Sequence, residues 1–213
     1  MTPVVCLITD RARVPGGADG TVACVTWAAR AGVQLVQVRE RDLDGGPLTA
    51  LVRRCVAVVR GTRTRVLVND RLDVALAAGA HGVHLRADSM PAAKVRTLSP
   101  PGFLLGRSVH ARDEALHAAA AGGLDYLLFG TVFATSSKPG RRPAGASAMA
   151  EVATAVSLPV LAVGGVTPDN VGEVAMAGSA GFAAIGVFAT ASEAALARSV
   201  AAATVAFVAA SRR

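Results

Sequence analysis

Short apolar runs rich in Val, Leu, Ile and Phe recur along the whole chain, and each is followed by glycine or polar residues. Runs that are apolar at successive positions, rather than at alternate ones, predict strands buried on both faces, as in a parallel sheet. The predicted strands cover residues 4–8, 34–39, 65–68, 82–85, 103–105, 125–129, 159–163 and 182–185.

Segments with helix signals separate these strands. Pro47 suits the first position of a helix, and Gly79 suits the end of one. The predicted helices cover residues 21–31, 47–60, 71–78, 91–98, 112–121, 147–156 and 192–210, and residues 167–169 open another. Eight strand–helix units in 213 residues favour one α/β domain over residues 1–213, a single (β/α)8 barrel (TIM barrel), with a doubly wound sheet as the alternative.

Two glycine turns follow the last two predicted strands. Gly164 and Gly165 follow the seventh strand, and Ile185 and Gly186 end the eighth. The loops after the last two strands of such a barrel are the usual phosphate site, because backbone N–H groups there can point at one anion. We expect these four residues to bind a phosphate; the alternative is that the glycines only allow tight turns.

Composition narrows the class of protein. Apolar residues make up 52% of the chain, enough for a large core, and no apolar run reaches the ~18 residues of a membrane helix. The start of the chain resembles a strand rather than a signal peptide. Three cysteines without a metal-ligand spacing suit a reducing compartment. We therefore expect a cytoplasmic protein that binds no membrane.

The chain is basic, with 22 Lys and Arg residues and a net charge of +7. Basic proteins often bind nucleic acid, but aromatic residues make up only 4% of this chain and the basic residues form no dense run. We expect no nucleic-acid partner. A basic surface can also steer anionic metabolites towards a cleft.

Polar residues follow the second and third strands, at the end of the barrel where active sites lie. Arg39 and Arg41 share one face if the strand continues, and arginine binds phosphate oxygens with two parallel hydrogen bonds. Asn69 and Asp70 offer oxygen ligands suited to Mg²⁺. Each pair also has an ordinary interpretation: solvated arginines beside a glutamate, and an N-cap for the next helix.

Further candidates come from the later loops. The polar loop 130–145 is long, which is typical of functional loops. Lys138 within it could close over an anionic leaving group, unless it is a plain exposed lysine. His84 and His110 are candidates for proton transfer near neutral pH. His84 ends an apolar strand, so we expect a structural role there and favour His110.

Six segments resemble the thiamine-phosphate synthase/TenI family in order and spacing. They are QVRER (37–41), LVNDRLDVAL (67–76), GVHL (82–85), GRSVH (106–110), DYLLFGTVFATSSK (125–138) and PVLAVGGVTPDN (159–170). The resemblance implies a (β/α)8 barrel enzyme of thiamine biosynthesis, often a homodimer. The family's synthases join hydroxymethylpyrimidine pyrophosphate to a thiazole phosphate with Mg²⁺. Its TenI-type tautomerases move a proton on a carboxythiazole phosphate and need no cofactor.

The resemblance also assigns residues to the two substrates. Those that match the pyrophosphate and metal side are Arg39, Asn69, Asp70, Ser108 and Lys138, and those that match the thiazole phosphate side are Thr135, Ser137, Gly165 and Gly186. Gln37 and Arg41 are further expected substrate-binding residues. The expected catalytic residues are His110, Lys138 and Ser108.

Two motifs depart from the family patterns. Where synthases usually carry VHLGQxD, whose Asp is a second Mg²⁺ ligand, Ser89 takes the place of that Asp, Asp88 precedes it and Arg86 replaces the glycine. Losing a metal carboxylate weakens Mg²⁺ binding, so Asp70 and the displaced Asp88 are the expected metal ligands. Tautomerases carry a histidine in FGHVF where this chain has Thr131, which cannot titrate near neutral pH.

The residues of GRSVH and DYLLFG are closer to TenI-type members. Together with the altered metal motif, they lead us to expect a TenI-like, tautomerase-type enzyme that acts on a thiazole phosphate. A thiamine-phosphate synthase is the alternative, and a non-catalytic binder of thiamine-pathway phosphates is the second alternative. The expected ligands are a thiazole phosphate and, for a synthase, a pyrimidine pyrophosphate, with Mg²⁺ as cofactor only in the synthase.

Overall fold

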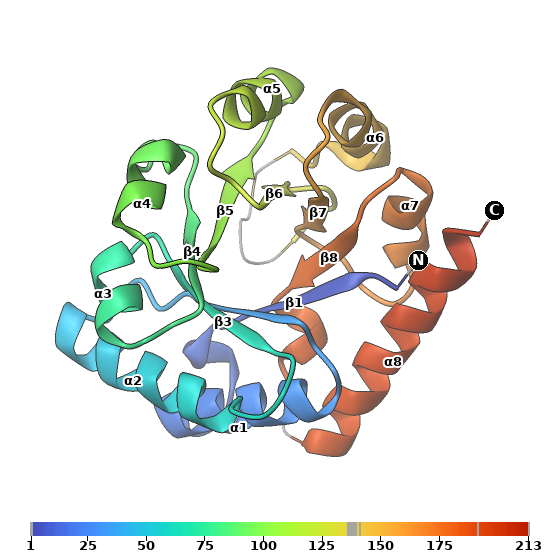
Figure 1. Cartoon of the computed structure of the whole chain (residues 1–213). Coiled ribbons are helices and arrows are strands. Elements are labelled where there is room, and N and C mark those ends of the chain that lie inside the picture. The colour runs from blue at the N-terminus through green and yellow to red at the C-terminus, as the bar shows by residue number, and fades with distance from the viewer. Residues whose placement is uncertain (1, 136–139, 141, 191, 213) are drawn as a thin grey trace.

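The computed structural model describes residues 2–135, 140, 142–190 and 192–212. Within them, eight parallel strands close into a barrel in chain order, and eight α-helices surround it (Figure 1). Each strand pairs with the next, and β8 (Gly181–Ala184) pairs with β1 (Val4–Ile8), so the sheet closes on itself. The predicted (β/α)8 barrel is confirmed, and the doubly wound alternative is wrong.

The strands lie close to their predicted positions. The remaining ones are β2 (Leu35–Val38), β3 (Arg65–Asn69), β4 (Gly82–Leu85), β5 (Leu104–Val109), β6 (Tyr126–Phe129) and β7 (Val160–Val163). β5 is longer than predicted because its pairing with β6 continues as far as Val109. Arg107 and Ser108 therefore lie within a strand and not in a loop.

The helices follow the predicted order. They are α1 (Gly17–Arg30), α2 (Gly45–Val58), α3 (Leu72–Ala77), α4 (Ala92–Leu98), α5 (Arg112–Ala120), α6 (Gly145–Ala155), α7 (Val171–Met176) and α8 (Glu193–Ala210). α1 begins at Gly17 rather than at residue 21. Two 3₁₀-helices, η1 (Arg11–Arg13) and η2 (Gly186–Phe188), follow β1 and β8 and have no signal in the hydrophobic pattern.

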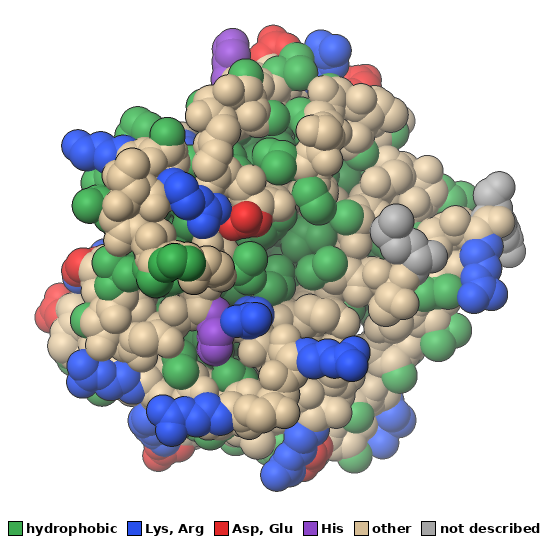
Figure 2. Space-filling view, viewed as in Figure 1, with side chains coloured by type: hydrophobic (Ala, Val, Ile, Leu, Met, Phe, Trp, Pro, Cys, Tyr) green, Lys and Arg blue, Asp and Glu red, His purple; other side chains and the backbone are tan. Residues whose placement is uncertain are grey.

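Alternation along each strand divides the barrel into two layers of side chains. Val5, Val36 and Val66 belong to the outer layer and pack in one cluster with helix residues. The inner cluster consists of Cys6, Ile8, Leu35, Leu67, Tyr126, Leu128, Leu161 and Ala183. Figure 2 shows apolar side chains gathered over the middle of the barrel, with Lys and Arg side chains around them. The barrel interior is therefore a packed core and not a pore.

The inward positions change from apolar to polar towards the C-terminal ends of the strands. On β2, Leu35 is followed two residues later by Gln37, and β3 ends at Asn69. β4 and β5 contribute His84 and Ser108, which contact each other. Because residues two apart share a face of a strand, this end of the barrel interior is lined by groups that can hydrogen-bond to a ligand.

α8 has the length and the mean hydropathy, 1.4, of a membrane-spanning helix. Its Leu196, Val200, Ala203 and Phe207 are buried members of the main core cluster. The helix also packs on α7 and α1. About 22% of this helix is buried, so packing against the barrel accounts for the apolar residues on one face of α8.

Gly181 lies where β8 closes on β1, opposite Val4. A Cβ at Gly181 would overlap the Val4 backbone, so we expect Gly181→Ala to lower the free energy of unfolding by about 1–3 kcal/mol, as over-packing does in a core. Urea denaturation measures the change. Gly46→Ala is the matched control, since nothing lies within 4 Å of its added Cβ. Equal stability of Gly181→Ala and the wild type would contradict this account of barrel closure.

Candidate active site

A cavity of about 440 Å³ lies at the C-terminal ends of the strands. The predicted site residues that line it are Gln37, Arg39, Arg41, Asn69, Asp88, Ser108, His110, Thr135, Gly164 and Ile185. These residues are spread over most of the sequence, and the closed barrel brings them to one place. Thr131, which replaces the tautomerase histidine, also lines the cavity.

Gln37 and Asn69 form a hydrogen-bonded pair on the cavity wall. The Gln37 amide donates from Nε2 to Asn69 Oδ1 at 2.9 Å. Gln37 is buried, and its Oε1 has no hydrogen-bond partner within the described part of the chain. A buried oxygen without a partner is costly. Gln37 Oε1 is therefore suited to accept a hydrogen bond from an N–H group of a ligand.

His84 is held at both ring nitrogens, as expected for a structural histidine. Nδ1 lies 2.9 Å from the Tyr126 hydroxyl, and Nε2 lies 2.8 Å from Ser108 Oγ. Burial, together with the charge of Arg107, lowers the pKa of His84 from 6.5 to about 3. The ring is therefore neutral, with one donor and one acceptor nitrogen. It fixes the Ser108 hydroxyl at the cavity wall.

Gly106 leaves the space that the Tyr126 ring fills. A Cβ at Gly106 would overlap this ring, because Gly106 pairs with Tyr126 on one side and with His84 on the other. Gly106, Tyr126, His84 and Ser108 thus form one packed and hydrogen-bonded group across β4, β5 and β6.

His110 lines the cavity just after the end of β5. Its backbone N–H donates to Glu114 Oε2 at 2.7 Å, and its Nδ1 contacts the Gly130 carbonyl oxygen. A carbonyl oxygen only accepts, so Nδ1 carries the proton of the neutral ring and Nε2 keeps a lone pair. His110 can therefore accept a proton, and its catalytic role stays a prediction.

Arg39 and Arg41 bring positive charge to the cavity. Glu40 between them turns away, and its carboxylate accepts from Thr9 Oγ1 at 2.5 Å and from the Arg11 N–H at 3.2 Å. Within the described residues, neither Arg39 nor Arg41 forms an ion pair. Burial, and then the charge of Arg41, lower the pKa of Arg39. Both arginines can therefore interact with a bound anion.

Asp70 and Asp88, the expected metal ligands, are bridged by one guanidinium group. Arg86 Nη2 lies 2.6 Å from Asp88 Oδ2, and Arg86 Nη1 lies 3.6 Å from Asp70 Oδ2. Ser89 Oγ donates to Asp70 Oδ1 and accepts from the Arg86 N–H at 2.8 Å. Asp70 lines a separate cavity of about 310 Å³ beside the first, and these two cavities share Arg41, Asn69 and Arg86. Ser89 thus ties the loop after β4 to Asp70.

The backbone of Asp70 is unusual. Among the described residues, Asp70 is the one non-glycine residue with a positive φ, 63°, a conformation that is uncommon for residues with a Cβ. Helix α3 has Arg71 at its N-cap position, and no side chain caps it. The alternative that Asp70 is an N-cap is therefore wrong, and its carboxylate instead contacts Ser89 and Arg86.

The glycine turns line a third cavity of about 250 Å³. Gly164 and Gly165 have φ values of 99° and 65°, and a Cβ on either would overlap the segment 131–134. These two glycines are therefore required by a tight turn. Gly186 has no positive φ and begins η2, and nothing lies within 4 Å of the position of an added Cβ. The turn does not require Gly186, which instead leaves open space at the cavity wall.

This small cavity adjoins the large one. Thr135, Val163, Gly164 and Ile185 line both cavities. A ligand with one end in the small cavity can therefore extend past these residues into the large cavity.

Ser137 and Lys138 lie outside the described residues, and their roles stay predictions. Sequence reasoning missed Arg107, whose guanidinium donates to the carbonyl oxygens of Ala87 at 3.0 Å and Met90 at 2.5 Å and so holds the loop after β4 against β5. It also missed Arg13, which lines the small cavity from η1. Arg13 belongs to no recognisable motif, and Arg107 lies in GRSVH but has no role assigned by the resemblance, so the fold reveals what both arginines contact.

A (β/α)8 barrel with a glycine-walled cavity, arginines and carboxylates at the C-terminal ends of its strands has the architecture of an enzyme for phosphorylated substrates. A family model described as thiamine monophosphate synthase matches residues 5–188. The chain belongs to this family, the thiamine-phosphate synthase/TenI family of enzymes.

Relatives in this family are similar over most of their length. A thiamine-phosphate synthase of Methanoculleus marisnigri is 43% identical over 159 residues, 74% of this chain and 75% of the relative. One of Anaeromyxobacter dehalogenans is 44% identical over 168 residues, 78% of this chain and 74% of the relative. A solved thiamine phosphate pyrophosphorylase from Pyrococcus furiosus has a TM-score of 0.83 and 28% identity, with 97% of this chain and 96% of that one covered. These names favour the synthase over the TenI-like interpretation.

The low pKa of His84 makes stability depend on pH. The pKa is 6.5 for an ordinary histidine and about 3 in the folded chain, so between these values the unfolded chain binds more protons. We expect the contribution of His84 to stability to be full above pH 6.5 and to be lost progressively as the pH falls towards about 3. Urea denaturation across this range measures the slope, which should be smaller in His84→Gln. NMR resonances of the His84 ring that titrate near pH 6.5 would contradict the neutral assignment.

Proposed function

We propose that this chain is a thiamine-phosphate synthase, which joins hydroxymethylpyrimidine pyrophosphate to a thiazole phosphate and releases pyrophosphate. The observation that carries the proposal is a pair of adjoining cavities with groups suited to anions at both ends. One end has Arg39 and Arg41, and the other has Gly164, Gly165 and Gly186. Two anionic substrates that react with each other require such a pair. The relatives named as synthases support the same choice.

The larger cavity suits the pyrimidine pyrophosphate. When the carbon–oxygen bond breaks, both bonding electrons leave with the pyrophosphate oxygen, and negative charge grows there. Arg39 and Arg41 supply fixed positive charge, which stabilises the leaving group more strongly as that charge grows. Ser108 and Asn69 can donate hydrogen bonds to its oxygens. We assign Lys138 the closing of the loop over it.

The smaller cavity suits the phosphate of the thiazole. The pyrimidine carbon left by bond breaking is electron-poor, and the thiazole nitrogen donates its lone pair to form the new carbon–nitrogen bond. Holding the phosphate between the glycine turns, with Thr135 and Ile185 at the shared wall, directs the thiazole ring towards the larger cavity. Gln37 Oε1 then accepts a hydrogen bond from the pyrimidine substrate.

The donor set fits Mg²⁺. Asp70, Asp88 and Asn69 offer hard oxygen donors, and a guanidinium group already lies between the two carboxylates, so this site accommodates a positive charge. When bound, Mg²⁺ supplies further positive charge to the pyrophosphate oxygens. Asp70 and Asp88 would hold the metal, and Arg86 would compete with it for the same carboxylates.

The TenI-like tautomerase is the second candidate, on the strength of His110. This ring lines the cavity, and its Nε2 can accept a proton because Nδ1 faces the Gly130 carbonyl. A tautomerase would move a proton on a thiazole phosphate without pyrophosphate or Mg²⁺.

For either activity we propose a cytoplasmic homodimer. The dimer rests on the family resemblance and the compartment on cysteine usage.

The synthase assignment is tested by turnover. Enzyme is mixed with hydroxymethylpyrimidine pyrophosphate, thiazole phosphate and Mg²⁺, and thiamine phosphate is followed with time. We expect product with the wild type, no product after chelation of Mg²⁺, and a fall in kcat of about 100-fold or more in Asp70→Ala. Asp73→Ala is the matched control, because that exposed carboxylate pairs with Arg71.

Absence of product at saturating substrates, with thiazole phosphate still bound in calorimetry, would reject the synthase. The carboxythiazole tautomer would then be the next substrate. Its turnover would identify a tautomerase, and its binding without turnover would identify a non-catalytic binder.

Arg86 is expected to weaken Mg²⁺ binding, because its guanidinium pairs with both Asp70 and Asp88. We expect Arg86→Ala to bind Mg²⁺ about 5-fold more tightly than the wild type without substrates, since an exposed ion pair contributes up to about 1 kcal/mol. Isothermal titration calorimetry measures the affinity. Arg71→Ala, which removes a neighbouring exposed arginine, should bind Mg²⁺ as the wild type does. Unchanged or weaker binding in Arg86→Ala would reject the competition.

A further inference from the structure

The small cavity beside the glycine turns has one charged side chain among the described residues that line it, that of Arg13. The other described lining residues are glycines and neutral side chains such as Thr135 and Val187. A phosphate monoester carries up to two negative charges, and removing such an anion from water is costly unless a cation or several donors compensate it. Arg13 is the described side chain able to provide that cation.

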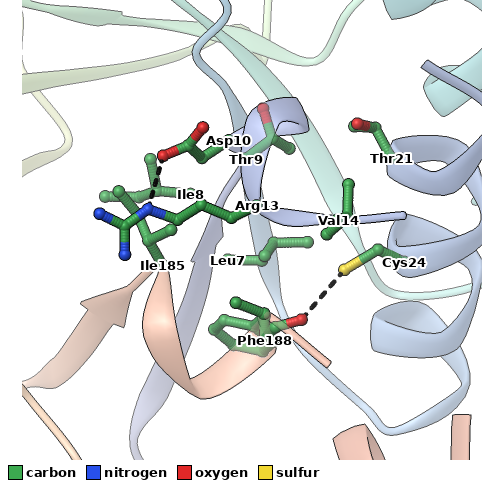
Figure 3. Close-up of a pocket in the computed structure, with 11 residues that line it drawn as sticks. Leu7, Ile8, Thr9, Asp10, Arg13, Val14, Thr21, Cys24, Ile185 and Phe188 are labelled. Atoms are coloured by element: carbon green, nitrogen blue, oxygen red, sulfur yellow. Dashed lines mark hydrogen bonds and ion pairs between the residues drawn. The ribbon is translucent and has the colours of Figure 1, made fainter. Parts of the chain in front are cut away.

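Arg13 reaches this cavity because of the turn after β1. Asp10 follows the strand, and η1 then places Arg13 next to the end of β8. Figure 3 shows the Arg13 side chain lying between Asp10 and Ile185. Arg13 Nε lies 3.0 Å from Asp10 Oδ2. This ion pair holds the guanidinium beside Ile185, which lines the same cavity.

The backbone on the opposite wall also suits an anion. Gly186 and Val187 line the small cavity. They are the first two residues of η2, so their N–H groups have no partner within that 3₁₀-helix. The absence of a side chain at Gly186 leaves these donors accessible, since an added Cβ would stand in open space. A cation from the β1 side and backbone donors from the β8 side thus meet at one small cavity.

We propose that Arg13 binds the phosphate of the thiazole substrate and that Asp10 is its positioning residue. The identity of the substrate rests on the proposed function, whereas the charge contact rests on the cavity alone. An arginine fork matches two phosphate oxygens. Arg13 therefore raises the affinity for the phosphorylated thiazole and not for the unphosphorylated alcohol. It acts away from the bonds that break and form, so it affects binding of this substrate more than kcat.

Calorimetry with thiazole phosphate, the unphosphorylated thiazole alcohol and inorganic phosphate tests the contact. We expect Arg13→Ala to weaken binding of thiazole phosphate about 10- to 100-fold, as the loss of a charged hydrogen-bond partner does, and to leave binding of the alcohol unchanged. Arg13→Lys should recover part of the affinity, because it restores the charge without the fork. Asp10→Asn should weaken phosphate binding less than Arg13→Ala, because it alters only the position of the guanidinium.

Arg11→Ala is the matched control. Arg11 belongs to the same 3₁₀-helix, but its guanidinium pairs with Asp42 and Glu40, and it is absent from the described lining of the phosphate cavity. It should bind all three ligands as the wild type does. Arg13→Gln keeps much of the side-chain volume without the charge and replaces Arg13→Ala if that variant does not fold.

The outcomes distinguish this contact from the proposed function. If the wild type makes thiamine phosphate and Arg13→Ala binds thiazole phosphate as tightly as the wild type, the contact is wrong and the synthase stands. If the wild type makes no product but binds inorganic phosphate in a manner that depends on Arg13, the contact stands and the synthase is wrong. Equal losses for thiazole phosphate and the alcohol would overturn the contact, because they would indicate a distorted cavity. A wild type that binds neither phosphate ligand would overturn both.

Discussion

Closure of the parallel sheet is the constraint on which the rest of the structure depends. Once β8 pairs with β1, alternate side chains of every strand must point into a narrow interior. That interior holds one small, mostly apolar cluster, and polar inward residues such as Gln37 and Asn69 lie at its C-terminal end. Strand ends therefore fix the floor of the site, whereas the arginines, the carboxylates and the glycine turns belong to the loops that follow these strands.

The two cavities of the site are suited to an anion in different ways. The larger cavity has fixed charges of both signs: Arg39 and Arg41 lie free of carboxylates in the described structure, while Asp70 and Asp88 face Arg86. The smaller cavity has mainly neutral walls shaped by glycine. Charge can be rearranged at the first end by moving one guanidinium group. At the second end the shape of the backbone dominates.

The pattern of apolar residues predicts the strands, because burial of short apolar segments determines where strands form. The apolar runs gave the strands to within a few residues, and the residues after them formed one cavity because parallel strands all end on the same side. Ion pairs such as Arg86 with Asp70, and the place of Arg13, depend on loop paths that have no periodic signal. Gly186 follows the pattern of a turn glycine, but its φ is not positive and an added Cβ would stand in open space, so neither the turn nor the packing around it requires a glycine.

The resemblance of two segments to TenI-type members, which led us to expect a tautomerase-type enzyme, has a structural explanation. Besides the altered metal motif, this expectation depends on GRSVH and DYLLFG, which contain Gly106 and Tyr126, and the fit of these two residues to each other is a matter of packing. Residues that pack in this way report on how the barrel interior is filled and not on which reaction follows. The relatives named as synthases outweigh them for that reason.

The group formed by Gly106, Tyr126, His84 and Ser108 also limits how this sequence can evolve. A side chain at residue 106 would overlap the tyrosine ring, and a ring without its hydroxyl would leave a nitrogen of the buried His84 without its partner. Single substitutions at these positions are therefore costly, and lineages that change one of them should change the others. Gly106, Tyr126 and His84 thus constrain the position of the Ser108 hydroxyl during evolution, although none of the three needs to contact a substrate.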